Sequence, residues 1–133
     1  MESELICLDT SVLIDYFRKT KKSNSFLYKL TEQYSLFAVS IITQYEIYVG
    51  SNEDQDPFWE QFFESMTVLP FDTKANEQAV RIYRKLKQKN KLIEIPDLLI
   101  SATAKAHSLK IATLNEKHFS RIEGLELISI DQI

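Results

Sequence analysis

Three carboxylates stand where strands should end or helices should begin. Asp9 directly follows the apolar run 5–8, Glu46 lies among apolar side chains in a helical pattern, and Asp97 opens the apolar segment 98–104. Carboxylates in such surroundings cost free energy unless positive charge meets them, and a divalent cation such as Mg²⁺ or Mn²⁺ is the simplest partner for several of them. The pattern therefore predicts a metal site made by Asp9, Glu46 and Asp97. Because Asp97 lies in a first helical turn, we also expect its pKa to be lowered.

Several side chains near these acids could support their chemistry. Thr43 and Glu46 are three residues apart and share a helix face. A metal held by the acids would neutralise a phosphodiester and make a bound water more nucleophilic. Thr10, Thr43, Thr113 and Asn115 are expected to orient carboxylates or that water, with His118 as a further candidate near the site. This chemistry indicates a metal-dependent nuclease acting on RNA.

Strands and helices alternate along the chain, and this alternation predicts how the acids are positioned. Apolar runs predict strands at 5–8, 36–39, 67–69, 110–112 and 126–130. Helical spacing, caps and prolines predict helices at 12–17, 25–33, 41–49 (with Gly50 at C′), 57–63, 73–90, from Pro96 onward, and at 116–119. The fold class is α/β, a three-layer α/β/α sandwich with a central, mainly parallel sheet of four to five strands. Since Asp9, Ser40 and Thr113 each follow a strand, they should lie at the carboxyl ends of the strands.

Size and composition are those of an ordinary globular protein. The chain has 133 residues, 44% hydrophobic and 26% charged, which predicts one domain over residues 1–133. We expect neither a signal peptide nor a membrane span, because Glu2 and Glu4 flank a short apolar run and no longer run follows. The single cysteine, Cys7, lies within an apolar strand and indicates a core residue in a reducing, cytoplasmic protein.

Basic residues gather in two clusters although the net charge is −3. The first cluster follows the Asp9 segment, and its members are candidates for RNA contact: Arg18, Lys19, Lys21 and Lys22. The second lies along the longest helix and comprises Arg81, Arg84, Lys85, Lys87, Lys89 and Lys91. A solvated surface is the simpler interpretation of one basic helix, but two clusters flanking an acidic site favour contacts with phosphates.

The chain resembles the PIN-domain family and, within it, the VapC-type toxins of bacterial toxin–antitoxin pairs. The matching segments occur in family order at residues 8–15, at 40–46 with Gly50, at 95–104 and at 112–119. The resemblance implies a PIN-like fold and a Mg²⁺- or Mn²⁺-dependent ribonuclease whose metal-site acids are Asp9, Glu46 and Asp97. It also implies a homodimer and a cognate antitoxin that covers the site.

One departure from the family pattern leaves an alternative open. His118 stands where the family usually carries a fourth acid, with Asn115 two residues after Thr113. We therefore hypothesise that a second metal is weakly bound or absent and that Asn115 orients water in its place. The alternative function is a catalytically weakened PIN-fold protein that acts as a protein- or RNA-binding module. A receiver domain is disfavoured because the chain lacks an acidic pair at the first strand. A haloacid-type phosphatase is disfavoured because Ser11 stands where it would need a second aspartate.

Overall fold

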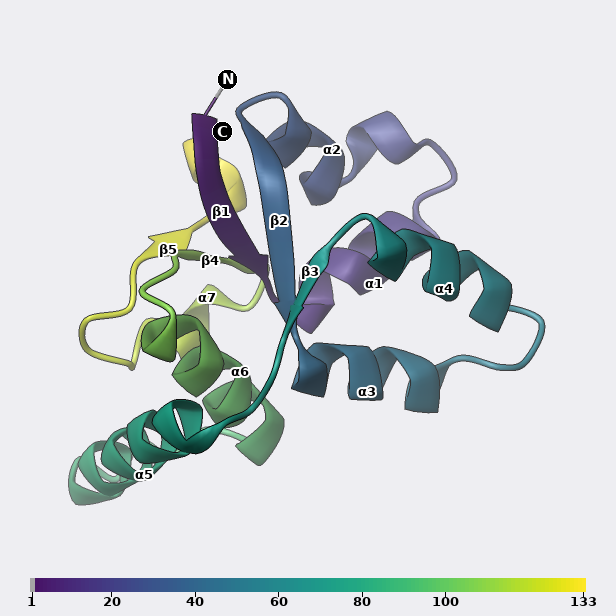
Figure 1. The fold of residues 1–133 in the computed structure, drawn as a ribbon. Coiled ribbons are helices and arrows are strands. Elements are labelled where there is room, and N and C mark those ends of the chain that lie inside the picture. The colour runs from purple at the N-terminus through teal and green to yellow at the C-terminus, as the bar shows by residue number, and fades with distance from the viewer. Residues whose placement is uncertain (1) are drawn as a thin grey trace.

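The computed structural model describes residues 2–133 of the chain. The elements, labelled in Figure 1, are β1 (Glu2–Leu8), α1 (Thr10–Arg18), η1 (Lys22–Asn24), α2 (Phe26–Thr31), β2 (Tyr34–Ser40), α3 (Ile41–Gly50), α4 (Asp56–Glu64), β3 (Thr67–Leu69), α5 (Thr73–Gln88), α6 (Ile95–Ala106), β4 (Ile111–Ala112), α7 (Glu116–Phe119), β5 (Leu127–Ile128) and η2 (Ile130–Gln132). None of the helices within residues 2–133 is long and apolar enough to cross a membrane.

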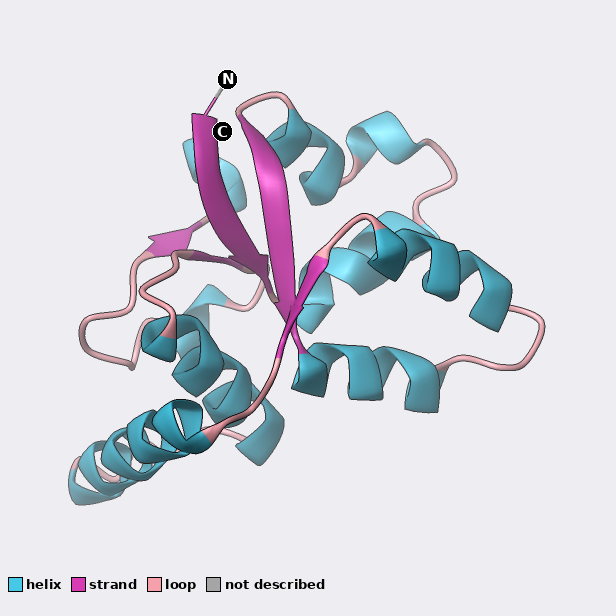
Figure 2. Ribbon diagram, viewed as in Figure 1, coloured by secondary structure: helices cyan, strands magenta, loops and turns pink. Residues whose placement is uncertain are grey.

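A parallel sheet forms the middle layer. In the described part of the chain it has five strands in the order β3-β2-β1-β4-β5, and every neighbouring pair is parallel. Helices lie on both sides of the sheet (Figure 2). The predicted three-layer α/β/α sandwich is thus confirmed, and the carboxyl ends of β1, β2 and β4 meet at one edge of the sheet.

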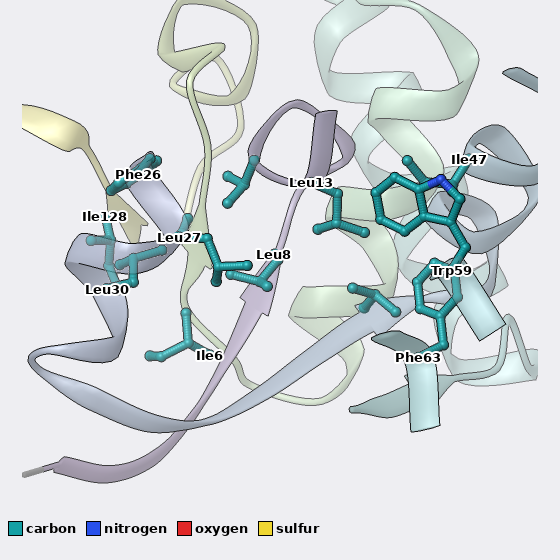
Figure 3. Packing of buried hydrophobic residues seen from close by; sticks show 13 residues of the cluster. Ile6, Leu8, Leu13, Phe26, Leu27, Leu30, Ile47, Trp59, Phe63 and Ile128 are labelled. Carbon is teal, nitrogen blue, oxygen red and sulfur yellow. The ribbon is translucent and has the colours of Figure 1, made fainter. Parts of the chain in front are cut away.

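The core has a separate cluster on each face of the sheet because side chains alternate along β1. Ile6 and Leu8 belong to the cluster formed with helices α1 to α4, where Trp59 packs from α4 (Figure 3). Cys7 belongs to the opposite cluster, with Ile100 of α6. Cys7 is fully buried, as expected of a core residue, and burial, with a smaller contribution from Asp9, raises the pKa of its thiol to about 12.

Helix α6 separates the sheet from α5, so α5 is the outer helix on this side (Figure 1). Ile100 and Ala104 of α6 pack toward the sheet. Leu98 of α6 packs with Ile82 and Leu86 of α5. The predicted buried position of the apolar helix that begins near Pro96 is confirmed, and the other side of α5 is left free to carry charge.

Some predicted boundaries were wrong. Gly50 is the last residue of α3 and has no left-handed φ; the cap is Ser51, whose extended backbone donates to the Tyr48 carbonyl at 3.4 Å. The predicted strand at 126–130 is only Leu127–Ile128. It ends early because Ser129 and Gln132 form a reciprocal cap, in which the Ser129 N–H donates to the Gln132 side chain at 2.9 Å.

Candidate active site

Asp9 is fixed at the end of β1 by three donors. It is the N-cap of α1 and only 2% exposed. Its Oδ2 accepts from the Ser11 hydroxyl at 2.7 Å, from the Ser11 N–H at 3.4 Å and from the Thr113 hydroxyl at 2.9 Å. Thr113 directly follows β4, so the parallel pairing of β1 with β4 brings these two side chains together. Such a carboxylate cannot rotate freely and presents a fixed oxygen.

Glu46 projects from α3 toward Thr10 of α1. Ser40 starts α3 as its N-cap, accepting from the Thr43 N–H at 3.1 Å, as predicted. The Thr10 hydroxyl lies 2.8 Å from Glu46 Oε1 and 3.0 Å from the Thr43 hydroxyl. A hydroxyl has one proton to donate, so when Thr10 donates to Glu46 it can accept from Thr43. Thr10 and Thr43 therefore lie beside Glu46, where the sequence predicted supporting residues.

The pKa of the Glu46 carboxyl is raised. Burial is the main cause, and the charges of Asp97, Asp9 and Glu94 add to it, while the hydrogen bond from Thr10 acts in the opposite direction. Repulsion by neighbouring carboxylates disfavours the ionised form. The smaller contributions of Asp97 and Asp9 to this shift indicate that the acids are close enough to repel one another.

Asp97 lies in the first turn of α6 and faces α7. Its Oδ2 is 3.3 Å from His118 Nδ1 and 3.4 Å from Asn115 Nδ2, and the two nitrogens are 2.9 Å apart. His118 Nδ1 can donate to Asp97 when it carries a proton, or accept from Asn115 when it does not. Either way, the two residues predicted as supporting the acids both contact Asp97.

The expected lowering of the Asp97 pKa was wrong. Burial raises this pKa, and the hydrogen bond and charge of His118 reduce the rise without cancelling it. Asp9 and Glu94 raise it further. The N-terminus of a helix favours a charged acid, but here burial and like charges outweigh that effect.

Hydrogen bonds link Asp9 with Asp97, and Glu46 joins them through the neighbour of Asp9 in the sequence. The Asn115 N–H donates to the Thr113 hydroxyl at 2.8 Å, so one short segment contacts Asp9 through Thr113 and Asp97 through the Asn115 amide. Thr10, next to Asp9, contacts Glu46. We call Asp9, Glu46 and Asp97 the acidic edge.

The acidic edge offers donors of the kind that a divalent cation binds. Carboxylate oxygens are the ligands that Mg²⁺ and Mn²⁺ prefer. A cation would offset the burial and, to a smaller extent, the repulsion that raise the pKa of Glu46 and Asp97. Among the described residues, no group of three or more acidic, histidine or cysteine side chains is already arranged to bind a metal ion. The three carboxylates are chemically suited to a divalent cation. Their oxygens make hydrogen bonds to nearby hydroxyls, to Asn115 and to His118.

The first basic cluster divides into two parts. Arg18 and Lys19 line a hollow of about 420 Å³ together with Ser11, which also contacts Asp9. Lys21 is exposed, whereas the Lys22 ammonium donates to the carbonyls of Tyr16 and Phe17 at 2.6 and 3.0 Å. Lys22 thus has a structural contact already, and Arg18 and Lys19 lie beside the acidic edge.

Two residues of the site were missed at the level of sequence. Ser11 contacts Asp9, and its hydroxyl also accepts from the Leu114 N–H at 3.1 Å. The signal was its place two residues after an N-cap aspartate, a spacing at which side chains bond locally. Glu94 adds negative charge near Glu46 and Asp97, and its signal was its place one turn before Asp97.

The fold and the site define a general class of protein. It is a parallel α/β sandwich that carries carboxylates at the carboxyl ends of its strands. Comparison with known proteins narrows it. The family model for the PIN domain matches residues 6–125, so the chain belongs to the PIN-domain family.

Individual relatives agree with this family. The chain is 34% identical over 132 residues to Ribonuclease VapC1 of Methanocaldococcus jannaschii, covering 98% of this chain and 90% of that protein. Its fold is similar to DNA-bound VapBC from Salmonella typhimurium, with a TM-score of 0.81, 25% identity and coverage of 97% and 99%. It is also similar to a toxin–antitoxin complex from Klebsiella pneumoniae, with a TM-score of 0.77, 25% identity and coverage of 96% and 99%.

Proposed function

We propose that this protein is a metal-dependent endoribonuclease of the VapC type, a toxin neutralised by a cognate antitoxin. The observation that carries the proposal is the acidic edge, where hydrogen bonds join Asp9 with Asp97 and Glu46 contacts Thr10 beside Asp9. The relative from M. jannaschii, named a ribonuclease, supports RNA as the substrate.

The acidic edge would hold Mg²⁺ or Mn²⁺ through Asp9, Glu46 and Asp97. When bound, the metal supplies charge neutralisation at a phosphodiester and activation of a water. The chain's own residues position the ligands. Thr113 and Ser11 hold Asp9, Thr10 holds Glu46, and Asn115 and His118 contact Asp97. These contacts limit the reorganisation that the carboxylates undergo when a cation arrives.

The surroundings of Asp97 support one metal rather than two. An imidazole and an amide, rather than a further carboxylate, contact its Oδ2. Neither supplies the negative charge that a second hard cation requires. We therefore keep the hypothesis of one strong metal site, with Asn115 placed to orient water, and calorimetry with Mn²⁺ should give one strong site per chain.

RNA would enter past the hollow lined by Arg18 and Lys19. Guanidinium and ammonium groups beside the acids can hold the phosphates that flank the cleaved bond. Lys21 is exposed nearby, and Lys22 would contribute only if it left its two carbonyl partners.

The protein partners are an antitoxin and a second copy of this chain. The similarity to a toxin–antitoxin complex supports the first. An apolar surface on α3 and the start of α6 supports the homodimer, because Tyr45 is 67%, Val49 66% and Ile95 60% exposed. Apolar side chains exposed together are typical of a protein interface.

The test of the proposed function is cleavage of a mixed RNA pool. The protein with added Mn²⁺ should cut the RNA, and excess chelator should stop the reaction. RNA that stays intact with Mn²⁺, while the protein still binds it, would instead support the catalytically weakened binding module.

A further inference from the structure

A basic groove lies between α5, α6 and the segment that follows α7, outside the acidic edge. Its volume is about 430 Å³. Six of its lining residues are cationic: Arg81, Arg84, Lys85, Lys89, Lys105 and Arg121. Among the described residues, Glu123 is the one acid that lines it. We call this feature the α5 groove; its positive charge is concentrated in a protein whose net charge is −3.

Contacts inside the α5 groove leave its arginines on α5 free. Glu123 pairs with Lys85 at 3.1 Å and with Lys89 at 2.6 Å, and these lysines lower the pKa of its carboxyl to about 2. Arg81 and Arg84 are exposed and make no hydrogen bond or ion pair with any described residue. Two guanidinium groups are therefore available for an anion.

The rim opposite α5 is held in place by two backbone contacts. The Lys105 ammonium donates to the Glu123 carbonyl at 2.9 Å, and Arg121 donates to the Leu92 carbonyl at 3.1 Å. Gly124 follows with a φ of 76°, and a Cβ there would lie 3.3 Å from the Lys105 nitrogen. A side chain at this position would crowd Lys105, so glycine lets the rim keep this shape.

The α5 groove is connected to the acidic edge through α6 and through α7 with the segment that follows it. Arg121 lies just beyond α7, and α7 carries His118, which contacts Asp97. The Leu92 segment that Arg121 contacts leads directly into α6 and Asp97. Along α6, the rise of about 1.5 Å per residue places Lys105 roughly 12 Å from Asp97. The groove and the acidic edge are therefore neighbouring regions along the same helix.

The lining of the α5 groove matches a single strand of RNA. Arginine forks bind phosphates in two-point contacts. Ile82, Leu86 and Ile122 lie beneath them and are only 5%, 2% and 5% exposed, so the groove presents mainly its positive charge, which suits the backbone of a single strand. A small anion would need fewer than the six cationic side chains of the lining, which come from α5, α6 and the segment after α7.

We propose that the α5 groove binds the single-stranded RNA that flanks the cleaved bond, with Arg81 and Arg84 holding its phosphates. This inference rests on the proposed ribonuclease function, since it extends the path of the same substrate. It assigns a role to the second basic cluster that is separate from that of Arg18 and Lys19. An acidic segment of a partner protein would match the charge but would have no reason to follow the path toward Asp97.

The test compares two double variants on the same helix. Arg81→Gln/Arg84→Gln removes two charges inside the groove, and Lys74→Gln/Lys87→Gln removes two exposed charges of α5 outside its lining. Both are made in the Asp97→Asn protein, with chelator present, so that cleavage cannot interfere. Fluorescence anisotropy with a labelled single-stranded RNA of mixed sequence is measured over a series of KCl concentrations.

The arginine variant should bind this RNA about tenfold more weakly, and its salt dependence, log K against log [KCl], should become shallower by roughly 1.4 because two phosphate contacts are lost. The lysine variant should stay within about twofold of the parent. The proposal would be overturned if the two double variants bound RNA equally well, whether both matched the parent or both lost the same affinity. It would also be overturned if the parent did not bind RNA.

A third variant should change RNA binding in the opposite direction. Glu123→Gln frees Lys85 and Lys89 for phosphates, so RNA should bind more tightly and with a steeper salt dependence. Weaker or unchanged binding would count against the groove. These binding results are independent of cleavage. A wild-type protein that binds RNA in the groove but never cuts it refutes the nuclease, whereas cutting with no effect of the groove variants refutes this inference alone.

Discussion

The acidic edge and the α5 groove shift the pKa of a carboxyl group in opposite directions. In the acidic edge, burial and neighbouring carboxylates raise the pKa of Glu46 and Asp97. In the groove, two lysines lower the pKa of the exposed Glu123 to about 2. The acids of the edge have polar partners but no Lys or Arg paired with them among the described residues, whereas Glu123 has two such partners.

This difference shows what each region lacks. The acidic edge keeps unneutralised negative charge, which suits an arriving divalent cation. The α5 groove keeps unneutralised positive charge on Arg81 and Arg84, which suits an arriving polyanion. The two regions would therefore complement the two components of one reaction, the metal and the RNA.

The largest expected effect comes from removing an acid of the edge. Asp9→Ala, Glu46→Ala or Asp97→Ala should each lower RNA cleavage with Mn²⁺ by roughly 10²-fold or more, because each removes a metal ligand. The control is Glu116→Ala, which removes an exposed acid of α7 and should keep full activity. Rates are measured by gel assay and folding by circular dichroism. Full activity of Asp97→Ala would remove this residue from the metal site.

The next effect is stabilisation by metal. At about 100 times its dissociation constant, Mn²⁺ should contribute about 2.7 kcal/mol of stability and raise the Tm by roughly 10 °C. Glu46→Gln should lose most of this rise, while Glu123→Gln should keep it. Differential scanning fluorimetry provides the comparison. A Tm rise of equal size in the two variants would mean that Mn²⁺ binds outside the acidic edge.

A smaller effect is the pH dependence of the metal-free protein. The pKa values of Glu46 and Asp97 in the folded protein lie above their ordinary values. Between the ordinary and the raised pKa, the native state therefore binds more protons than the unfolded state. The contribution of these acids to stability should therefore fall as pH rises from their ordinary pKa through the raised values. Glu46→Gln/Asp97→Asn, studied with chelator, should be more stable than wild type at neutral pH. A less stable double variant would contradict the repulsion in the edge.

The smallest effect belongs to Glu123. Its pKa is lowered, so its pairs with Lys85 and Lys89 stabilise the protein above the ordinary carboxyl pKa and lose this contribution as pH falls toward about 2. Because these side chains are exposed, the change should be slight and should shrink further with added salt. Denaturant unfolding of wild type and Glu123→Gln at several pH values would measure it. An effect that persists in high salt would speak against an exposed pair.

Local sequence signals fixed most of the fold. Ser40 and Asp72 cap α3 and α5 as their types predict, accepting backbone N–H groups at 3.1 and 3.0 Å. Asn90, expected to end α5, has a φ of 54°, and the next N–H closes on the Leu86 carbonyl at 2.9 Å. Such signals act over a few residues, which is why they can be read from sequence.

The site was harder to predict where several effects compete over long separations. The contact between His118 and Asp97 spans 21 residues and depends on how α6, β4 and α7 pack together. The Asp97 pKa is raised mainly by burial, with smaller contributions from Asp9 and Glu94, and the helix-start argument included none of these effects. Sequence placed the acids near one edge, but it could not rank burial, repulsion and hydrogen bonding within that edge.

The segment from Thr113 to His118 reaches two acids at once, Asp9 through Thr113 and Asp97 through Asn115. It belongs to the last quarter of the sequence, and it arrives only when β4 pairs beside β1, the first strand. A chain still emerging from the ribosome carries Asp9 and Glu46 long before this segment exists. The arrangement around Asp9 and Asp97 is therefore incomplete until this later segment has been made and β4 has paired with β1.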